Sequence, residues 1–209
     1  MKRLKILLSW LLLAGGSYFF YNGAREYFES RYSQESAANS WSAAEREAAE
    51  VDGRIVPFGP RTQSSIPAGA AFAKLSIPRL HAVVYVVEGT DDADLRRGPG
   101  HLEGTAFPGA YGNCVIAGHR DTHFRVLKDI HKGDEIDLET AAGNFTYRVD
   151  EISVVSPNNT ASLQPTSHPV LNLITCYPFC YVGSAPKRFV VRAGIVMSRA
   201  ARSGLSPAS

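Results

Sequence analysis

Three residues that could act together on a carbonyl group are spread along the second half of the chain. They are His119 in "VIAGHRDTH", Cys176 at the end of "LNLITC" and Arg188 in "KRFVVRA". A thiol is mostly protonated at pH 7 and reacts only when a base or a positive charge favours its thiolate. Histidine supplies the base, and arginine favours the thiolate and offers N–H donors to a developing oxyanion. This combination indicates acyl transfer through a thioester.

The residues also have simpler interpretations. Cys176 ends an apolar run and could be a core cysteine, because free cysteines are often buried. Arg188 taken alone is typical of a solvated strand position. We interpret Cys114 in "GNCVIAG" as a core thiol and His101 in "RGPGHLEGT" as structural or wall-lining. Cys180 lies four residues beyond Cys176, so a reversible disulfide between the two is an open alternative, although its geometry is demanding.

A second histidine raises the question of a metal site. His119 and His123 have the i, i+4 spacing with which HExxH helices bind zinc. Arg120 stands where the glutamate of that motif would be, and the sequence offers no third ligand. We therefore expect His123 on the exposed side of a helix that packs through Phe124 and Leu127. Acidic clusters elsewhere fit a helix start or a solvated strand face, and we predict no metal and no cofactor.

A series of short β-type runs begins at Phe72 and would position these residues. The runs are "FAKLSI", "AVVYVV", "NCVIAG", "DEIDLET", "FTYRVDEISVV", "LNLITC" and "KRFVVRAGIVM". Many short strands at this spacing predict a closed barrel or a sandwich. Two segments interrupt them with helical character, "DDADLRRG" with acidic residues at its start and "DTHFRVLKDI" with apolar residues at helical spacing.

The N-terminus predicts a membrane anchor. "MKRLK" supplies three basic residues, and no charge follows from 6 to 21, where the run ends in the aromatic "SYFFY". The length approaches that of a hydrocarbon core, the aromatic residues suit the far interface, and the basic cluster places the N-terminus in the cytoplasm. A cleaved signal peptide is the alternative, because small residues at 14–16 fit a cleavage site. The apolar run continues beyond that site, which favours an anchor.

Composition excludes several classes of protein. The chain has 209 residues, enough for one domain with appendages. Its net charge is +2, and the basic residues form no stripe, so we expect no nucleic-acid partner. Three cysteines without a CxxC doublet argue against a disulfide scaffold and a structural zinc site.

Three separated stretches together resemble the sortases, and most of all their class D group. They are "GTAFPGAYGNCVIAGHRDTHFRVLKDIHKGDEIDL", "LITCYPF" and "VGSAPKRFVVRA". The sortase signature Thr-Leu-x-Thr-Cys reads Asn-Leu-Ile-Thr-Cys here, with Asn172 in its first position. The order His, Cys, Arg also matches, with 57 residues from His119 to Cys176 and 12 from Cys176 to Arg188.

The resemblance implies a mainly β fold, a closed eight-stranded sortase-type barrel with short helices, preceded by a transmembrane helix. It implies a cysteine transpeptidase that cleaves an LPxTG-like sorting signal of exported proteins after threonine. Cys176 would be the nucleophile, His119 the proton donor and acceptor, and Arg188 the oxyanion-stabilising and substrate-positioning residue. An amine would accept the acyl group, either from a peptidoglycan precursor or from a pilin lysine. The loop "SPNNTASLQPTSHPV" (156–170) would form much of the pocket for the sorting signal.

These features predict an anchor at 1–24, an extracytoplasmic stalk and linker at 25–70, the catalytic barrel at 71–197 and a tail at 198–209. The expected location is the bacterial cell membrane, with a single pass and an extracytoplasmic catalytic domain. Two other functions stay open: a sortase-type pilin polymerase that joins subunits through lysine, and a non-enzymatic extracellular binding module. The sorting motif, LPxTG, LPxTA or a relative, is not determined by these residues.

Overall fold

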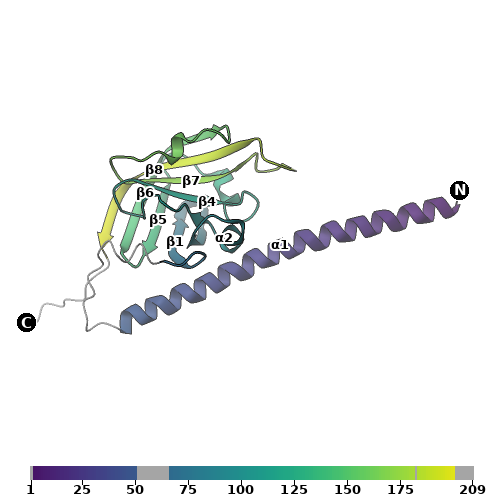
Figure 1. Cartoon of the computed structure of the whole chain (residues 1–209), viewed down its shortest axis with the longest axis horizontal. Helices are drawn as coiled ribbons and strands as arrows, with labels where there is room; N and C mark the ends of the chain where they lie inside the picture. The colour runs from purple at the N-terminus through teal and green to yellow at the C-terminus, as the bar shows by residue number, and fades with distance from the viewer. Residues whose placement is uncertain (1, 51–65, 182, 201–209) are drawn as a thin grey trace, which may run out of the picture.

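A closed barrel of eight strands forms the body of the molecule (Figure 1). The computed structural model describes residues 2–50, 66–181 and 183–200. Around the barrel the strands follow the order β1-β2-β3-β4-β7-β8-β6-β5, and β5 closes the barrel by pairing with β1. Two neighbouring pairs are parallel, β2 with β3 and β4 with β7, and the others are antiparallel. The predicted eight-stranded barrel is confirmed.

The strands coincide closely with the β-type runs of the sequence. Their bounds are β1 Ala71–Ile77, β2 Ala82–Glu88, β3 Gly100–His101, β4 Asn113–Gly118, β5 Glu135–Thr140, β6 Gly143–Val155, β7 Val170–Tyr177 and β8 Lys187–Ala200. Period-two alternation explains the match in strands such as β1 and β5, whereas the apolar runs of β4 and β7 are buried on both faces. In β5, for example, Ile136 and Leu138 are fully buried while Glu135 is exposed.

The barrel core is filled by side chains from one face of nearly every strand. Leu75, Ile116, Leu138, Leu173 and Val191 have at most 1% of their surface exposed. Phe124 and Leu127, from the segment after β4, close the core at one end. Because the inward residues of β4, β7 and β8 hold these strands against the core, the opposite residues on the same strands are held rigidly on the outer face.

One strand has no β-type run in the sequence. β3 comprises only Gly100 and His101, within the stretch that reads as a glycine-rich turn. It pairs with β2 on one side and β4 on the other. Gly100 has no room for a side chain, because a Cβ there would lie 2.0 Å from the Gly89 carbonyl oxygen. Such a short strand is formed by its neighbours and not by its own propensity.

The short helices are α2 Asp92–Arg97 and the 3₁₀ helices η2 Pro78–Leu80, η3 Arg125–Asp129 and η4 Ala161–Leu163. The segment 121–130 was expected to be a helix with His123 exposed, and this prediction is wrong. His123 precedes η3, lies in a turn and is only 7% exposed. Phe124, Leu127 and Ile130 are buried as expected, but they are placed by turns and a 3₁₀ segment, because the chain bends around the barrel end.

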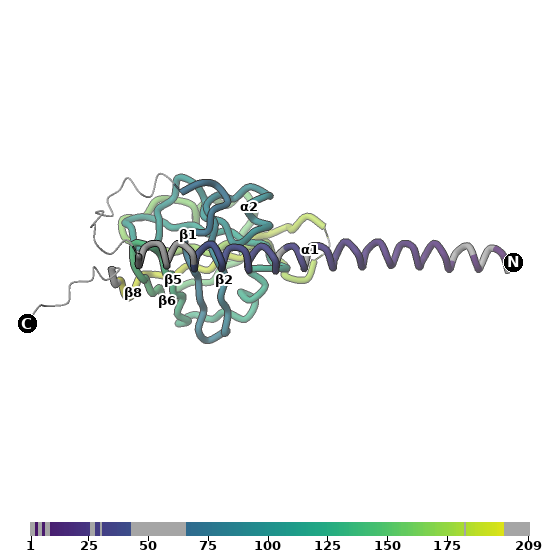
Figure 2. The backbone as a smooth tube through the Cα atoms, turned by 90° about the horizontal axis from the view of Figure 1, so that it is seen from below, coloured from purple at the N-terminus to yellow at the C-terminus, as the bar shows by residue number. Residues whose placement is uncertain are grey.

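Helix α1, Lys2–Glu50, runs along the barrel and projects well beyond it at its N-terminal end (Figures 1 and 2). Its second half packs against α2, β1 and β2. Gln34 of α1 binds the backbone of β2 at Tyr85, where β3 does not pair with it. Its side-chain amide accepts a hydrogen bond from the Tyr85 N–H and donates to the Tyr85 and Arg97 carbonyls. Among the described residues, no helix has the length and apolarity that crossing a membrane requires.

The domain boundaries predicted from the sequence stay predictions. Most of the expected linker, residues 51–65, lies outside the described residues, as does the end of the tail at 201–209. Strand β8 continues to Ala200 and there pairs with Gly143 of β6.

Candidate active site

Strand pairing brings His119, Cys176 and Arg188 into one row across three neighbouring strands. In the parallel β4–β7 pair, the last residue of β4, Gly118, lies opposite Thr175. His119 follows directly after the end of β4, and Cys176 is the next residue of β7. In the antiparallel β7–β8 pair, Cys176 lies directly opposite Arg188. Neighbouring strands are about 4.8 Å apart. Cys176 and Arg188 are therefore placed on adjacent strands, and His119 at the end of the strand on the other side of β7.

The side chains of Cys176 and Arg188 belong to the outer face of the barrel. Cys114, Ile116, Leu171 and Leu173 pack into the core. Because side chains alternate along a strand, Cys176 faces outward, out of phase with Leu171 and Leu173. Arg188 likewise alternates with the core residues Val191 and Ala193 of β8. Cys176, His119 and Arg188 are each partly exposed. Cys176 is therefore not the buried core cysteine of the simpler interpretation.

The backbone around the row is fixed by short contacts between β4 and β7. The Thr175 hydroxyl is buried and donates a 2.6 Å hydrogen bond to the Gly118 carbonyl. Gly118 itself lies under the ring of Phe124, where a Cβ would approach a ring carbon to 2.7 Å. These contacts fix the ends of both strands, so the residues that follow, His119 and Cys176, start from rigid positions.

The loop between β7 and β8 is hydrogen-bonded to Arg120, the neighbour of His119. Arg120, the residue after His119, donates from Nη2 to the Tyr181 carbonyl at 2.8 Å and to the Gly183 carbonyl at 3.3 Å. Its guanidinium also lies over the Tyr181 ring, 5.8 Å from the centroid. Arg188 donates from Nη1 to the Lys187 carbonyl at 3.1 Å and to the Ala185 carbonyl at 3.4 Å. Both arginines thus order the loop that borders Cys176.

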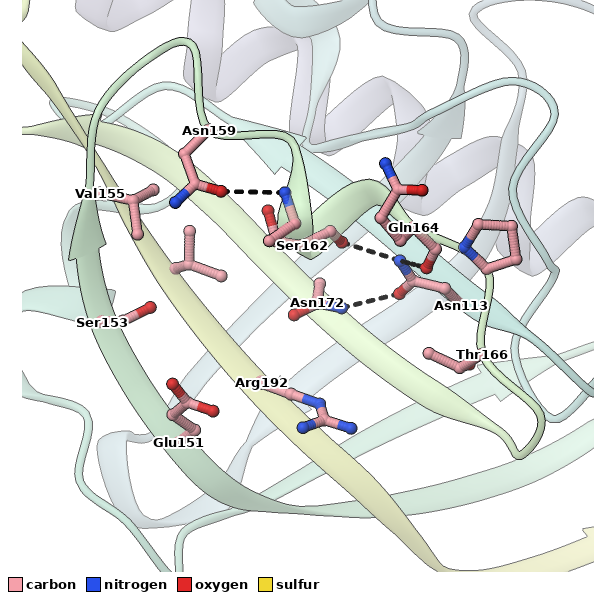
Figure 3. A pocket seen from close by; sticks show the side chains of 13 residues that line it. Asn113, Glu151, Ser153, Val155, Asn159, Ser162, Gln164, Thr166, Asn172 and Arg192 are labelled. Carbon is pink, nitrogen blue, oxygen red and sulfur yellow. Dashed lines mark hydrogen bonds between the residues drawn. The ribbon is translucent and has the colours of Figure 1, made fainter.

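A pocket of about 440 Å³ lies on the same outer face, beneath the loop between β6 and β7 (Figure 3). Its floor comes from β6, β7 and β8, and its roof from the loop 156–169, which includes η4. Val155 lines the pocket and pairs with Arg188. The pocket therefore extends from the neighbourhood of the His119–Cys176–Arg188 row along the barrel surface.

Two buried asparagines fix the roof of this pocket. Asn172 donates to Asn113 Oδ1 at 2.7 Å, and Asn113 Nδ2 donates to the Ser162 carbonyl at 2.7 Å and the Gln164 carbonyl at 3.0 Å (Figure 3). Asn113 and Asn172 are 4% and 3% exposed. A buried amide that satisfies both its donor and acceptor groups is a rigid connector, so the loop is held in place over β7.

The three cysteines have different environments. All are free thiols: Cys114 is buried, Cys176 is partly exposed and Cys180 is exposed. The alternative of a disulfide between Cys176 and Cys180 is therefore not realised in this structure. Burial raises the pKa of the Cys114 thiol, and Glu88 raises it further, so Cys114 stays protonated at neutral pH. The interpretation of Cys114 as a core thiol agrees with this environment.

Comparison with known proteins agrees with this geometry. A family model described as "Sortase domain" matches residues 75–196, which is more than half of the chain. The chain belongs to the sortase family. Sortase D of Bacillus subtilis is 41% identical over 125 residues, 59% of this chain and 63% of the relative. Sortase SrtE1 of Streptomyces coelicolor is 41% identical over 118 residues, 51% of this chain and 34% of the relative. The matches thus span less than two thirds of these curated relatives.

Solved sortase structures have the same fold. The sortase D5 transpeptidase of Clostridium perfringens superimposes with a TM-score of 0.62 at 28% identity, covering 73% of this chain and 95% of that one. Sortase E1 of Streptomyces coelicolor, solved with a tripeptide in the active site, gives a TM-score of 0.57 at 32% identity, covering 66% of this chain and 96% of that one. The class D relatives confirm the resemblance predicted from the sequence.

Two features of this sortase were missed by sequence reasoning. His101 is buried, with Nδ1 2.9 Å from Glu88 Oε2 and Nε2 3.0 Å from Thr105 Oγ1. Its partner Glu88 is the last residue of β2, and nothing in the local sequence signals a contact that depends on the β2–β3 pairing. The asparagine connector was also missed, although the departure at Asn172 from the sortase signature marks one of its members.

The largest of the described pockets, about 910 Å³, lies elsewhere on this sortase. It is bounded by α1, the start of β2 and the segment 121–126, and it does not contain Cys176. His123 lines it while being mostly buried. Burial lowers the pKa of His123, and nearby His119 lowers it further, against the opposing effects of the Arg96 backbone and Asp121.

This environment predicts a pH-dependent stability. The unfolded chain protonates His123 near pH 6.5, while the folded protein resists protonation to a lower pH. The contribution of neutral His123 is therefore complete above pH 6.5 and is lost as the pH falls toward the folded pKa. Replacing His123 by glutamine should flatten the pH dependence of the unfolding free energy in that window by up to about 1.4 kcal/mol per pH unit. Denaturant unfolding of both proteins between pH 7.5 and 5 measures this, and identical slopes would contradict it.

Proposed function

We propose that this sortase is a membrane-anchored cysteine transpeptidase that cleaves an LPxTG-like sorting signal after threonine and transfers the protein to an amine. The observation that carries the proposal is the row His119–Cys176–Arg188, formed by the β4–β7 and β7–β8 registers. A thiol, an imidazole and a guanidinium on one exposed face supply a nucleophile, an acid/base group and oxyanion donors.

The first half-reaction forms a thioester. The Cys176 thiolate attacks the threonine carbonyl carbon, and an Arg188 N–H group donates to the oxygen as it becomes negatively charged. The C–N bond then breaks, and protonated His119 gives its proton to the leaving amine. In the second half-reaction the acceptor amine attacks the thioester and loses a proton to His119, which releases the Cys176 thiolate and forms a new amide bond. Water in place of the amine gives hydrolysis as a side reaction.

The pocket beneath the β6–β7 loop is the proposed site of the sorting signal. It lies on the face that carries Cys176, and its lining residues follow β6, β7 and β8 beneath the loop. The tripeptide in the active site of the Streptomyces coelicolor structure and the transpeptidase of Clostridium perfringens support a peptide substrate and an acyl transfer for this chain. The acceptor is an amine, either of a peptidoglycan precursor or of a pilin lysine.

The N-terminal part of α1 is the proposed membrane anchor, with its N-terminus in the cytoplasm and the barrel outside. The charge-free run at 6–21 and the basic residues before it support this orientation. Large apolar side chains of this run, including Trp10, Leu11 and Phe20, are exposed around the helix. Fractionation of cells that express the full chain, and protease treatment of intact spheroplasts, test it. Recovery in the soluble fraction, or protection of the barrel from protease, would contradict it.

A trapping experiment tests the reaction. The full chain, purified in detergent, is incubated with peptides that contain LPxTG or LPxTA, followed by intact-protein mass spectrometry. We expect a mass increase equal to the peptide fragment that ends in threonine, located on Cys176. Added hydroxylamine should release this fragment as the hydroxamate, which is characteristic of a thioester. Cleavage without an adduct on Cys176, or no cleavage of either peptide, would reject the proposal. Covalent ladders with a pilin-type substrate would favour the polymerase instead.

A further inference from the structure

A continuous track of outward-facing residues leads from Cys176 into the pocket beneath the β6–β7 loop. Along β7 and β8, the outward pairs are Cys176 with Arg188, then Ile174 with Val190, then Asn172 with Arg192. Each step covers two residues on each strand. At about 3.3 Å per residue, the Asn172–Arg192 pair lies about 13 Å from the Cys176–Arg188 pair.

Arg192 brings an unpaired positive charge to the far part of this track. It lines the pocket and is partly buried, and it forms no hydrogen bond or ion pair with any residue in the described part of the chain. Asn172, its partner in the β7–β8 register, is uncharged, as is Thr166, which lines the same pocket. A guanidinium that is partly withdrawn from water and lacks a partner favours binding of a carboxylate, to which its planar N–H groups are matched.

The pocket wall around Arg192 is already in place before a ligand binds. The Asn172–Asn113 pair adjoins it, and Asn113 holds the loop through the Ser162 and Gln164 carbonyls (Figure 3). Because the loop does not have to be ordered on binding, little of the interaction energy with a ligand is lost to entropy.

We propose that Arg192 is a specificity-determining residue, which binds a carboxylate side chain of the substrate immediately before the leucine of the LPxT-like motif. This proposal rests on the proposed function. In an extended peptide with its threonine carbonyl at Cys176, about 13 Å corresponds to four residues upstream. Those are x, proline and leucine of the motif and then the residue before the leucine. Arg192 would thus extend recognition beyond the pentapeptide and select for Glu or Asp at that position.

Glu151 is the other charged residue among those that line the pocket, and it modulates this selection. It lies opposite Arg192 in the β6–β8 register, and its side chain is exposed. In Figure 3 the Arg192 guanidinium extends away from the Glu151 carboxylate. Glu151 therefore leaves the guanidinium available, but its negative charge repels an acidic ligand. Removing that charge should strengthen the preference for an acidic residue.

The test compares three peptides that differ only in the residue before the leucine, which is Glu, Gln or Lys. The kcat/KM values are measured with the full chain in detergent, for the wild type and for R192Q and E151Q. For the wild type we expect the Glu peptide to exceed the Lys peptide by about fivefold. The difference should appear mainly in KM, since the contact is remote from the reacting bond. It should also decrease at high ionic strength, since the charges are near the surface.

Partial unfolding of a variant would lower its kcat/KM equally for all three peptides. The ratio of kcat/KM values between two peptides, measured with the same variant, is therefore unaffected by it. In R192Q the ratio of Glu to Lys peptide should fall to about one, and in E151Q it should rise above that of the wild type. Equal kcat/KM values for all three peptides in the wild type, or an unchanged ratio in R192Q, would overturn the role of Arg192 while leaving the transpeptidase intact. Failure to cleave any of the three peptides would instead overturn the proposed function on which this role rests.

Discussion

Replacing Cys176 by alanine in the full chain is expected to abolish both cleavage and transfer of LPxTG-type peptides, a loss of at least about 10⁴-fold in kcat. The reason is that the thioester cannot form without the sulfur, and neither His119 nor Arg188 offers a nucleophile in its place. Cys176 is the only one of the three thiols that belongs to the row with these residues. Release of the cleaved peptide fragment, followed by chromatography, measures the effect.

Cys180 provides the matched control. It is an exposed free thiol only four residues from Cys176, so Cys180→Ala removes a similar group from the same region. We expect this variant to keep the activity of the wild type and its adduct on Cys176. Activity that survives in Cys176→Ala, or that disappears only in Cys180→Ala, would show that the nucleophile is assigned to the wrong residue.

Replacing Arg188 by alanine is expected to lower kcat by about 10² to 10³-fold, as found for the loss of one oxyanion donor. Arg188 lies directly opposite Cys176 in the β7–β8 register. Its Nη1 is engaged with two backbone carbonyls, which orients the guanidinium; its other N–H groups have no partner among the described residues. Those free donors are the ones that can reach the oxygen of a bound threonine carbonyl. Single-turnover rates of thioester formation measure the loss.

The effect of Arg188 must be separated from a general loss of positive charge. Arg148 is the control, because its ion pair with Glu135 on β5 is exposed. Arg148→Gln should keep kcat within about twofold, since exposed ion pairs contribute little. Arg188→Lys keeps the charge but not the planar set of donors, and we expect it to recover only part of the rate. Full activity in Arg188→Lys would mean that charge alone suffices and that the oxyanion role is wrong.

Much of the barrel could be predicted because its signals are local. Period-two alternation in runs such as "DEIDLET" predicts strands whose apolar face is buried, and β5 has that arrangement. The prediction failed where structure comes from distant neighbours. β3 has two residues and exists only because β2 and β4 flank it. His123 was expected at the surface, but the 3₁₀ and turn geometry of its segment directs it inward.

The identity of the residues that could react, their order along the chain and most of the strands near them follow from the amino-acid sequence alone. Side-chain chemistry and hydrophobic periodicity are local features, so they can be recognised without knowledge of the fold. The parallel pairing of β4 with β7, with Gly118 opposite Thr175, follows only from the folded barrel, and it places the residues after them, His119 and Cys176, at the same end of the pair. The same holds for the hydrogen bond between Asn172 and Asn113, and for the place of Arg192 in the pocket, where no residue of the described chain pairs with it. Register depends on how whole strands fill a common core, and a shift by one residue would turn each of these side chains to the other face.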